Sequence, residues 1–297
     1  MRILLTGSSG FLGQIIFNKI GNDYIKTLNR KNGDYQISLD LEVPIFDTPF
    51  ELIIHSAGKA HSTPKTEQQK RAFYDVNVQG TKNLLKGLEH GNALPRAFIF
   101  ISSVAVYGKE TGHLIIEESP LQAKDPYGDS KVQAEITIQD WCKKNNVICT
   151  ILRLPLIAGP NPPGNLKTMI NGLKKGYYFN IAGGKAKKSI VLAEDVAKII
   201  PVAAKIGGVY NLTDQYHPSF SELSQLIAKQ LGKSKPLNIP FWIAKLIALA
   251  GDMIGNNAII NSKKLLKITS DLTFDDSKAR RILGWAPAPV LRDFKIN

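Results

Sequence analysis

Short apolar runs alternate with longer amphipathic stretches through the first half of the chain. The runs have the length of buried strands, and the stretches between them repeat apolar residues at helical spacing. Strands that are apolar on both faces and separated by helices are typical of a parallel sheet covered on both sides. The predicted strands are 2–6, 24–28, 51–58, 97–103 and 147–154, and the predicted helices are 11–20, 66–89 and 127–135.

The alternation ends after Leu154, where the chain enters the Pro- and Gly-rich stretch LPLIAGPNPPGN. Strand-like character returns within residues 190–213, and the tail from about residue 218 has mainly helical character. We therefore predict a sheet domain of residues 1–154, to which 190–213 return. Residues 155–189 and 214–297 are predicted to form a smaller, mostly helical second lobe.

Composition and charge narrow the class of partner. The 297 residues are 43% hydrophobic and 21% charged, which is typical of a globular chain with a sizeable core and not of a disordered one. The formal net charge of +13 comes mainly from scattered lysines and favours anionic ligands in general. The chain has no zinc-finger spacing, RRM signature or long basic run, so no nucleic-acid partner is expected.

The cysteines and apolar tracts bear on location. Cys142 and Cys149 lack both CxxC spacing and the density of a secreted scaffold, so a reducing cytoplasm is predicted. The N-terminal apolar run is too short for a signal-peptide core. The longest apolar tract, 241–251, falls short of the ~20 residues of a bilayer span, so no integral membrane segment is expected. We predict a buried or groove-lining helix there, and a membrane-surface role is the alternative.

The stretch TGSSGFLG places Gly7, Gly10 and Gly13 between the first predicted strand and the first predicted helix. Without Cβ atoms these residues permit a tight turn, close approach of a pyrophosphate, and close packing of helix on strand. Free N–H groups and the helix dipole then face the phosphates. The spacing is GxxGxxG, but its place in the chain predicts a dinucleotide site in a Rossmann-type, doubly wound parallel sheet. A purely structural turn is the alternative.

The end of the second predicted strand bears on the choice of cofactor. Dinucleotide sites usually place an acidic residue there, which accepts hydrogen bonds from both hydroxyls of the adenosine ribose. This chain instead has Asn29 and Arg30, and a guanidinium suits a 2′-phosphate. NADP is therefore favoured and NAD is the alternative. Asp40 is predicted to lie under the adenine edge or to be a plain loop aspartate.

PYGDSK places Tyr127 and Lys131 four residues apart at the start of a predicted helix, directly after Pro126. Residues i and i+4 share a helix face, so their side chains can converge on one point. A phenol with a reference pKa of ~10 is a poor base near neutrality, and an adjacent cation favours the phenolate. The two residues are a candidate acid/base pair, and an ordinary surface Tyr and Lys is the alternative.

With TGSSGFLG, ISSVAVYG and PYGDSK in this order, the chain resembles the extended short-chain dehydrogenase/reductase family, in its nucleotide-sugar epimerase/dehydratase/4-ketoreductase branch. The motifs IIHSAGKAH, DVNVQGT, LRLP and DDSKARRILGWAP agree, and the likeness covers nearly the whole length. The resemblance implies a Rossmann-type domain, an NAD(P) cofactor and a C-terminal substrate lobe. It also implies a nucleoside-diphosphate sugar as substrate, a UDP-hexose or UDP-N-acetylhexosamine derivative being favoured, and is compatible with a homodimer.

The resemblance further implies roles for single residues. Tyr127 would be the general acid/base at a sugar carbon, Lys131 would hold the nicotinamide ribose, and Ser103 would hydrogen-bond the reacting oxygen. Ser102 is the rival for the last role. The cofactor-binding set expected from the motifs and the resemblance is Gly7, Ser9, Gly10, Phe11, Leu12, Gly13, Asn29, Arg30, Asp40, Leu41, Ser56, Ala57, Gly58, Asn77, Ile101, Tyr127, Lys131 and Pro155.

The expected substrate-binding set is Lys59, Ser103, Val104, Tyr127, Asn165 and Lys188. Asn165 is alternatively a helix N-cap, a place that Asn favours, and the basic stretch 183–188 is alternatively a solvated loop. No metal site is expected, because His55 and His61 lack ligand spacing and a third ligand nearby.

Dehydratases of this branch carry an Asp–Glu pair directly after the hydroxyl residue, whereas this chain has Val104 and Ala105. Neither side chain can move a proton, which disfavours dehydration. The predicted function is hydride transfer at C4 of a nucleoside-diphosphate hexose, with 4-keto reduction as the net reaction. A nucleotide-sugar 4-epimerase is the first alternative, and a non-catalytic NAD(P)-sensing binding protein is the second.

Overall fold

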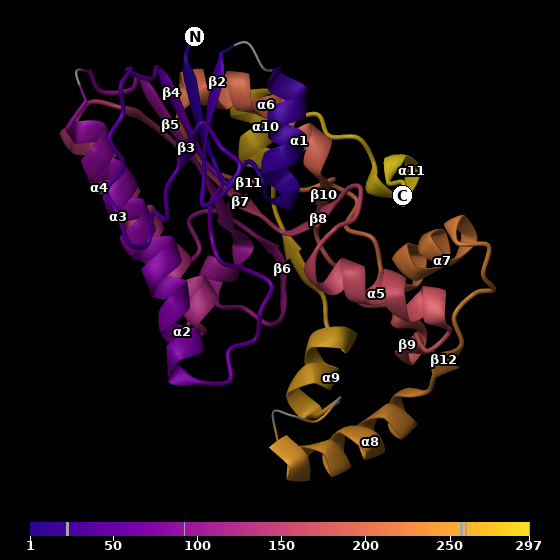
Figure 1. Cartoon of the computed structure of the whole chain (residues 1–297). Helices are drawn as coiled ribbons and strands as arrows, with labels where there is room; N and C mark the ends of the chain where they lie inside the picture. The colour runs from indigo at the N-terminus through magenta and orange to yellow at the C-terminus, as the bar shows by residue number, and fades with distance from the viewer. Residues whose placement is uncertain (22–23, 92, 256–257, 259, 297) are drawn as a thin grey trace.

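A parallel sheet of seven strands forms the centre of the molecule (Figure 1). The computed structural model describes residues 1–21, 24–91, 93–255, 258 and 260–296. The strand order is β11-β7-β5-β4-β1-β2-β3, and all neighbouring strands run parallel. The strands are β1 (Ile3–Thr6), β2 (Ile25–Asn29), β3 (Tyr35–Gln36), β4 (Leu52–His55), β5 (Ala97–Ser103), β7 (Ile148–Leu154) and β11 (Gly208–Asn211). The sheet confirms the predicted doubly wound α/β fold.

Helices cover both faces of this sheet. On one face pack α1 (Phe11–Ile20) and α6 (Ala193–Ile206), and on the other pack α3 (Gly80–Glu89) and α4 (Pro126–Lys144). In β1, Ile3 and Leu5 join the first core, whereas Leu4 joins the second. Successive strand residues point to opposite faces, so strands buried on both sides must be apolar throughout.

The predicted long helix 66–89 is three helical pieces in the structure. α2 (Glu67–Tyr74) begins at the N-cap Thr66, continues into a π-helical turn, η1 (Asp75–Gln79), and passes into α3. Single π-turns inside helices are frequent at functional sites. A 3₁₀ turn, η2 (Val104–Tyr107), follows β5 directly.

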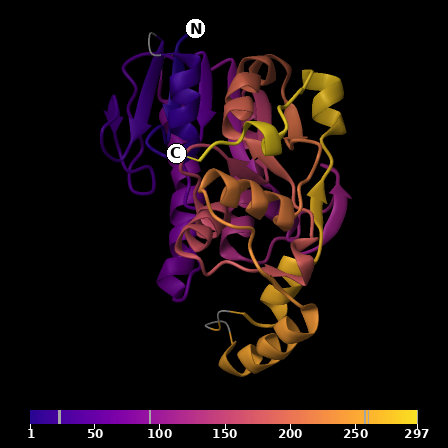
Figure 2. The ribbon, with the colours of Figure 1, turned by 90° about the vertical axis from the view of Figure 1, so that its right-hand side faces the viewer.

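A second lobe lies beside the sheet domain (Figure 2). Its apolar cluster packs α5, α7 and α11 against the paired strands β8 and β10. A second pair, β9 with β12, leads to α8 and α9, which lie at the end of the lobe farthest from the sheet. The bounds are β8 (Leu156–Ala158), α5 (Gly164–Lys175), β9 (Asn180–Ile181), η3 (Ala182–Gly184), β10 (Ile190–Leu192), α7 (Phe220–Gln230), β12 (Asn238–Ile239), α8 (Phe241–Ile254), α9 (Ser262–Thr269) and α11 (Val290–Asp293).

The C-terminal segment runs back from this lobe to the sheet domain. β13 (Leu272–Phe274) pairs with β6 (Gly112–Ile115), and α10 (Ser277–Leu283) follows. Leu283 and Trp285 are buried in the same core as α1 and α6. The predicted boundaries at 154, 190 and 213 stay predictions, and part of the range given to the substrate lobe packs on the sheet domain.

The apolar tract 241–251 lies in α8 and is not the buried helix that its composition predicts. Its buried residues are Ala244, Ala248 and Gly251, whereas its large apolar side chains are mostly exposed. An apolar sequence therefore does not guarantee burial when only small residues face a neighbouring element. No helix within the described residues is long and apolar enough to cross a membrane.

Candidate active site

The predicted catalytic and cofactor residues gather at the carboxyl edge of the sheet. The strand register sets Thr6 beside His55, His55 beside Phe100, and Ser103 beside Leu154 at the strand ends. The strand order reverses between β1 and β4, because β2 and β3 extend to one side and β5, β7 and β11 to the other. Ligands of open α/β sheets bind outside the carboxyl ends at such a switch point.

The glycine loop has the close contacts expected of a phosphate cradle. Gly7 has φ +74°, and a Cβ there would lie 2.6 Å from the Ala57 nitrogen. A Cβ on Gly13 would lie 2.1 Å from the Gly7 oxygen, so α1 sits directly on the loop. Gly10 is the N-cap of α1, no side chain caps it, and the first turn, which includes Phe11 and Leu12, holds no acidic residue. The open helix N-terminus fits a pyrophosphate.

Asn29 shapes this loop. Its buried side chain donates from Nδ2 to Ser8 Oγ at 2.7 Å, and its Oδ1 accepts from the Ser9 backbone nitrogen at 3.4 Å. The residue that replaces the expected carboxylate therefore ties the end of β2 to the glycine loop.

Arg30 and Asp40 form an ion pair beside that loop. Arg30 Nη2 lies 3.3 Å from Asp40 Oδ1, which also accepts from Ser38 Oγ at 2.7 Å. Partial burial acts to raise the pKa of Asp40, but the Ser38 hydrogen bond and the Arg30 charge outweigh it and hold the pKa below its ordinary value. Asp40 is thus a charged partner of Arg30, and its neighbour Leu41 is exposed.

The start of α4 is built to lie close to the strand end that carries Ser103. Asp125 caps the helix by accepting from the Gly128 nitrogen at 3.0 Å, and Pro126 occupies the first turn, where its missing N–H costs nothing. A Cβ on Gly128 would lie 2.7 Å from the Ala105 oxygen in η2. Glycine at this position therefore brings Tyr127 against the turn that follows Ser103.

The Ser103 side chain interacts with the Tyr127 phenol. Burial raises the pKa of the Tyr127 phenol above its ordinary value, and the Ser103 side chain opposes that rise only in part. The Phe73 ring, fully buried, lies 6.1 Å from the Tyr127 ring between centroids. In the ligand-free protein the phenol is therefore protonated near neutrality, and a base role needs a cation nearby.

Lys131 is a buried amine one turn along the same helix. Its Nζ donates to the Ile101 oxygen at 2.6 Å and lies 4.0 Å from the centroid of the Phe100 ring. Burial lowers the pKa of Lys131 to about 7, although Glu135 acts in the opposite direction. A Cβ on Gly58 would lie 3.9 Å from this nitrogen, so the loop after β4 adjoins it.

The two adjacent serines differ in their partners. Ser102 is buried and donates to Glu135 Oε1 at 2.5 Å, and Glu135 in turn accepts from Arg153 Nη2 at 2.7 Å. Ser102 thus belongs to a buried ion pair, whereas Ser103 faces Tyr127. Val104 packs in an apolar cluster at the start of η2 and offers no proton.

Asn77 connects the loop after β4 to the first turn of α4. Its Oδ1 accepts from the Lys59 backbone nitrogen at 2.7 Å, and its Nδ2 donates to Ser130 Oγ at 2.9 Å. Ser130 donates onward to the Tyr127 carbonyl at 2.8 Å. Asn77 lies in the π-turn η1, so that irregular turn places the amide between the two segments.

His55, for which the sequence argues only against a metal site, has two buried hydrogen-bond partners that no sequence pattern indicated. Its Nδ1 lies 2.7 Å from Thr6 Oγ1, and its Nε2 lies 3.0 Å from Thr81 Oγ1. Thr81 donates to the Asn77 carbonyl at 2.6 Å. Burial lowers the pKa of His55 to about 3, with a smaller effect from Lys131, so the ring is neutral. The only sequence signal was a polar residue ending the apolar run LIIH.

Four more of the predicted residues lie at or near the sheet edge. Ser56 and Ala57 lie against Gly7, and Pro155 follows β7 at the same sheet edge. Lys59 places its Nζ 5.6 Å from the centroid of the Phe73 ring, which neighbours Tyr127.

Two predicted substrate residues lie in the second lobe. Asn165 is exposed in the first turn of α5, whose N-cap is Pro163, so the N-cap alternative is wrong. Lys188 donates from Nζ to the Ser270 oxygen at 2.9 Å, and burial lowers its pKa to about 8. No hydrogen bond or ion pair within the described part of the chain joins either residue to Tyr127.

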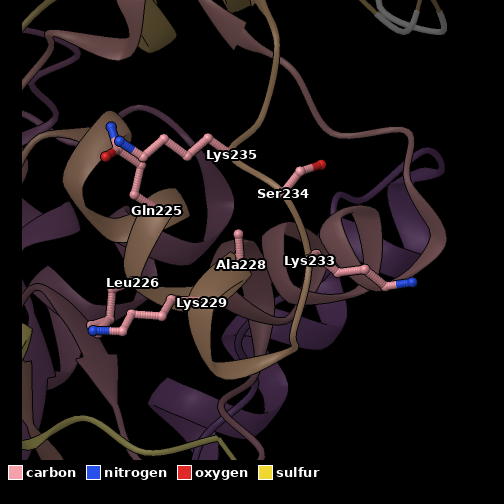
Figure 3. Close-up of a pocket in the computed structure, with 7 residues that line it drawn as sticks. All are labelled: Gln225, Leu226, Ala228, Lys229, Lys233, Ser234 and Lys235. Atoms are coloured by element: carbon pink, nitrogen blue, oxygen red, sulfur yellow. The ribbon is translucent and has the colours of Figure 1, made fainter.

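The described residues include no group of three or more His, Cys, Asp or Glu side chains that could hold a metal ion. The pocket in Figure 3 lies in the second lobe, away from the sheet edge, and lysines from α7 and the following segment line it.

The fold, together with a Ser–Tyr–Lys set beside a glycine loop, defines an extended short-chain dehydrogenase/reductase. A family model described as "NAD dependent epimerase/dehydratase family" matches residues 3–212, and the chain belongs to this family. The fold and the family thus confirm the resemblance stated from the motifs.

Similar proteins span nearly the whole chain. A UDP-glucose 4-epimerase of Vibrio cholerae is 29% identical, covering 98% of this chain and 92% of its own. An N-acetyl-alpha-D-glucosaminyl-diphospho-ditrans,octacis-undecaprenol 4-epimerase of Escherichia coli O157:H7 is 27% identical, covering 93% and 88%. The solved UDP-glucose 4-epimerase of Thermotoga maritima, with UDP-glucose, has the same fold (TM-score 0.72, 21% identity, covering 97% and 94%).

Proposed function

We propose that the protein is an NAD(P)-dependent 4-epimerase of a hexose whose anomeric carbon carries a diphosphate. The observation that carries the proposal is the placement of the Tyr127 phenol with the Ser103 side chain at the carboxyl edge of the sheet, beside the glycine loop. Two relatives that align with more than nine-tenths of the chain are 4-epimerases, which supports ranking epimerisation above the 4-keto reduction predicted first.

Tyr127 would move the proton in both halves of the reaction. A bound nicotinamide dinucleotide would accept the hydride from C4 and return it. The Tyr127 oxygen, as the phenolate, would take the proton of the C4 hydroxyl while that carbon loses its hydride and becomes a ketone. Once the ketone had turned its other face, Tyr127 would give the proton back to the oxygen as C4 regains the hydride. Atoms and electrons then balance, since only the configuration at C4 has changed.

Ser103 and Lys131 would support this proton transfer. Ser103 Oγ, whose side chain interacts with the phenol, would hold the reacting oxygen within reach of both groups. In its charged form Lys131 would favour the phenolate against the effect of burial, and it would also hold the nicotinamide ribose. Val104 and Ala105 supply no further acid or base, which argues against dehydration.

The glycine loop, with Gly7, Gly10 and Gly13, would hold the pyrophosphate of the cofactor. Asp40 affects the choice between NAD and NADP, because its carboxylate lies beside Arg30 and would repel a 2′-phosphate on the adenosine ribose. The ion pair therefore favours NAD, which fits an enzyme that keeps an oxidised cofactor. The remaining cofactor-binding residues keep their predicted roles as part of this proposal.

A 4-keto reductase that uses NADPH is the second candidate. Arg30 favours it, because a guanidinium can leave Asp40 for the stronger charge of a phosphate, and no carboxylate ends β2. In this reading NADP is the favoured cofactor, as predicted from the sequence.

The second lobe, residues 155–189 and 214–297, would bind the rest of the substrate, with Asn165 and Lys188 toward the diphosphate and Lys59 near the sugar. A UDP-hexose or UDP-N-acetylhexosamine is the first choice of substrate. A polyprenyl-diphosphate sugar is the alternative, which the second relative supports.

Native mass spectrometry of the purified protein, followed by turnover without added cofactor, tests the proposal. We expect retained NAD and conversion of UDP-glucose or UDP-N-acetylglucosamine, or of the polyprenyl-linked sugar, into the C4 epimer. Consumption of NADPH in step with reduction of a 4-keto sugar, without epimer formation, would instead establish the second candidate.

A further inference from the structure

Helix α8 shows its large apolar side chains to the outside and its small ones to the protein. Ala244, Ala248 and Gly251 are buried, and the two alanines pack in one cluster with Leu265 of α9. At about 100° per residue, the opposite face carries a stripe of large residues at spacings of four, three and four. The stripe is Trp242, Leu246, Leu249 and Met253, which are 65%, 60%, 52% and 91% exposed.

The apolar stripe continues onto its surroundings. Leu237 before the helix, Phe241 at its first position, and Ile247 and Ile254 on its flank are exposed as well. Single exposed apolar residues are ordinary, but a contiguous apolar surface marks an interaction site. Both views place α8 at the far end of the second lobe, where a flat partner can reach it (Figures 1 and 2).

The sequence that flanks this helix on both sides is strongly cationic. Residues 233–270 include six lysines, Lys233, Lys235, Lys245, Lys263, Lys264 and Lys267, and one acidic residue, Asp252. Lys245 lies on α8 itself and is exposed, and so are Lys233, Lys235 and Lys263. Figure 3 shows the side chain of Lys233 extending away from α7. Lys267 is paired with Glu110 at 2.8 Å, so the argument from positive charge uses the exposed Lys233, Lys235, Lys245 and Lys263.

We propose that α8 docks the second lobe on the surface of a lipid bilayer rich in anionic headgroups. A helix of 14 residues lies in the plane of the interface and does not cross it. Trp242 and the leucines would enter the headgroup and acyl boundary, and the lysines would meet the anionic headgroups. A second copy of the chain is a poorer occupant, because it would bring the same cationic surface against this one.

This inference does not rest on the proposed reaction. It uses no residue of the sheet edge, so vesicle binding and epimerase activity can fail separately. If both hold, the substrate lobe works at a membrane surface, where a lipid-borne diphosphosugar would be within reach.

The protein contains its own reporter for the test. Of its three tryptophans, Trp141 and Trp285 are buried and Trp242 is exposed, so a change in emission on vesicle binding reports α8. We expect the full chain to sediment with phosphatidylcholine vesicles containing about a third of phosphatidylglycerol, with blue-shifted emission, and to bind pure phosphatidylcholine far less. Raising the salt should weaken the binding.

Leu246→Gln with Met253→Gln should lower the vesicle affinity at least about tenfold, because two large apolar side chains would no longer leave water. Ile45→Gln with Ile206→Gln, two exposed aliphatic positions of the sheet domain, is the matched control and should bind like wild type. Sugar turnover with a soluble substrate should be unchanged in both.

Three results would overturn the proposal. The first is that wild type does not bind anionic vesicles at low salt. The second is that the α8 variant binds them as tightly as wild type. A concentration-dependent dimer that the α8 variant abolishes, without vesicle binding by wild type, would assign the surface to a second copy.

Discussion

At the scale of single residues, the site joins a phenol made less acidic by burial to an amine made less basic by the same cause. Both shifts move the two groups toward their neutral forms. The Ser103 side chain alone does not compensate for the burial of Tyr127.

Tyr127→Phe should lower kcat about 10² to 10⁴-fold, because only the proton-transfer group is removed. Cofactor binding and the thermal midpoint should stay close to wild type, since the aromatic contact with Phe73 remains. Steady-state assays on the epimerised sugar, with cofactor titration as the control, check this. Near-normal turnover would show that another group moves the proton.

Lys131→Met should change the pH dependence of stability. The folded pKa of about 7 lies below the ordinary lysine value of 10.5, so between these values the unfolded chain binds more protons and stability rises with pH. Methionine cannot bind this proton, so the pH dependence is lost in the variant. Its free energy of unfolding, relative to that of wild type, should decline by about 1.4 kcal/mol per pH unit between pH 7 and 9. Urea unfolding at pH 6, 7, 8 and 9 measures the difference. A difference that is constant with pH would contradict the prediction.

At the scale of elements, the contact between α4 and the η2 turn fixes the active-site geometry. Gly128→Ala would place a methyl group 2.7 Å from the Ala105 oxygen and 2.7 Å from the Ala123 Cβ, so the helix must move away. Overpacking of this kind costs about 1 to 3 kcal/mol, and a shift of about 1 Å can cost 10²-fold in rate. We expect kcat to fall at least about tenfold.

Gly91→Ala is the matched control for that variant, because its Cβ would meet only the Leu88 oxygen, at 3.4 Å. Parallel measurement of kcat and urea stability separates displacement of Tyr127 from general loss of folded protein. An active Gly128→Ala enzyme would mean that α4 can shift without separating Tyr127 from Ser103.

At the scale of the whole molecule, the C-terminal segment couples the two parts. Trp285 is buried in the core with α1 and α6, and its Nε1 donates to the Thr213 oxygen at 3.0 Å. Trp285→Ala should lower the free energy of unfolding by about 3 to 5 kcal/mol. Trp242→Ala, at an exposed position, should change it by less than about 0.5 kcal/mol. Circular dichroism during urea unfolding measures both, and equal losses would contradict this account of the core.

The sequence by itself determined the sheet domain, the glycine loop and the candidate residues of the site. These features depend on patterns within a few residues, because hydrophobic alternation sets strands and helices and i, i+4 spacing sets Tyr127 beside Lys131 on a helix. Gly13 is likewise explained within the loop, since a Cβ there would meet the Gly7 oxygen, whereas the close approach of Gly7 to Ala57 is set by the fold.

Only the tertiary structure decided which partners the polar side chains have. Asn29 binds the glycine loop, Arg30 binds Asp40, and Ser102 binds Glu135, and each pair joins segments at least ten residues apart. Strand order and helix packing create these contacts, and no local pattern encodes them. The exposure of α8 has the same origin: its sequence has apolar residues on every side, and burial depends on which face meets α9. A side chain is buried only where another element packs on it, and the fold decides which elements pack together.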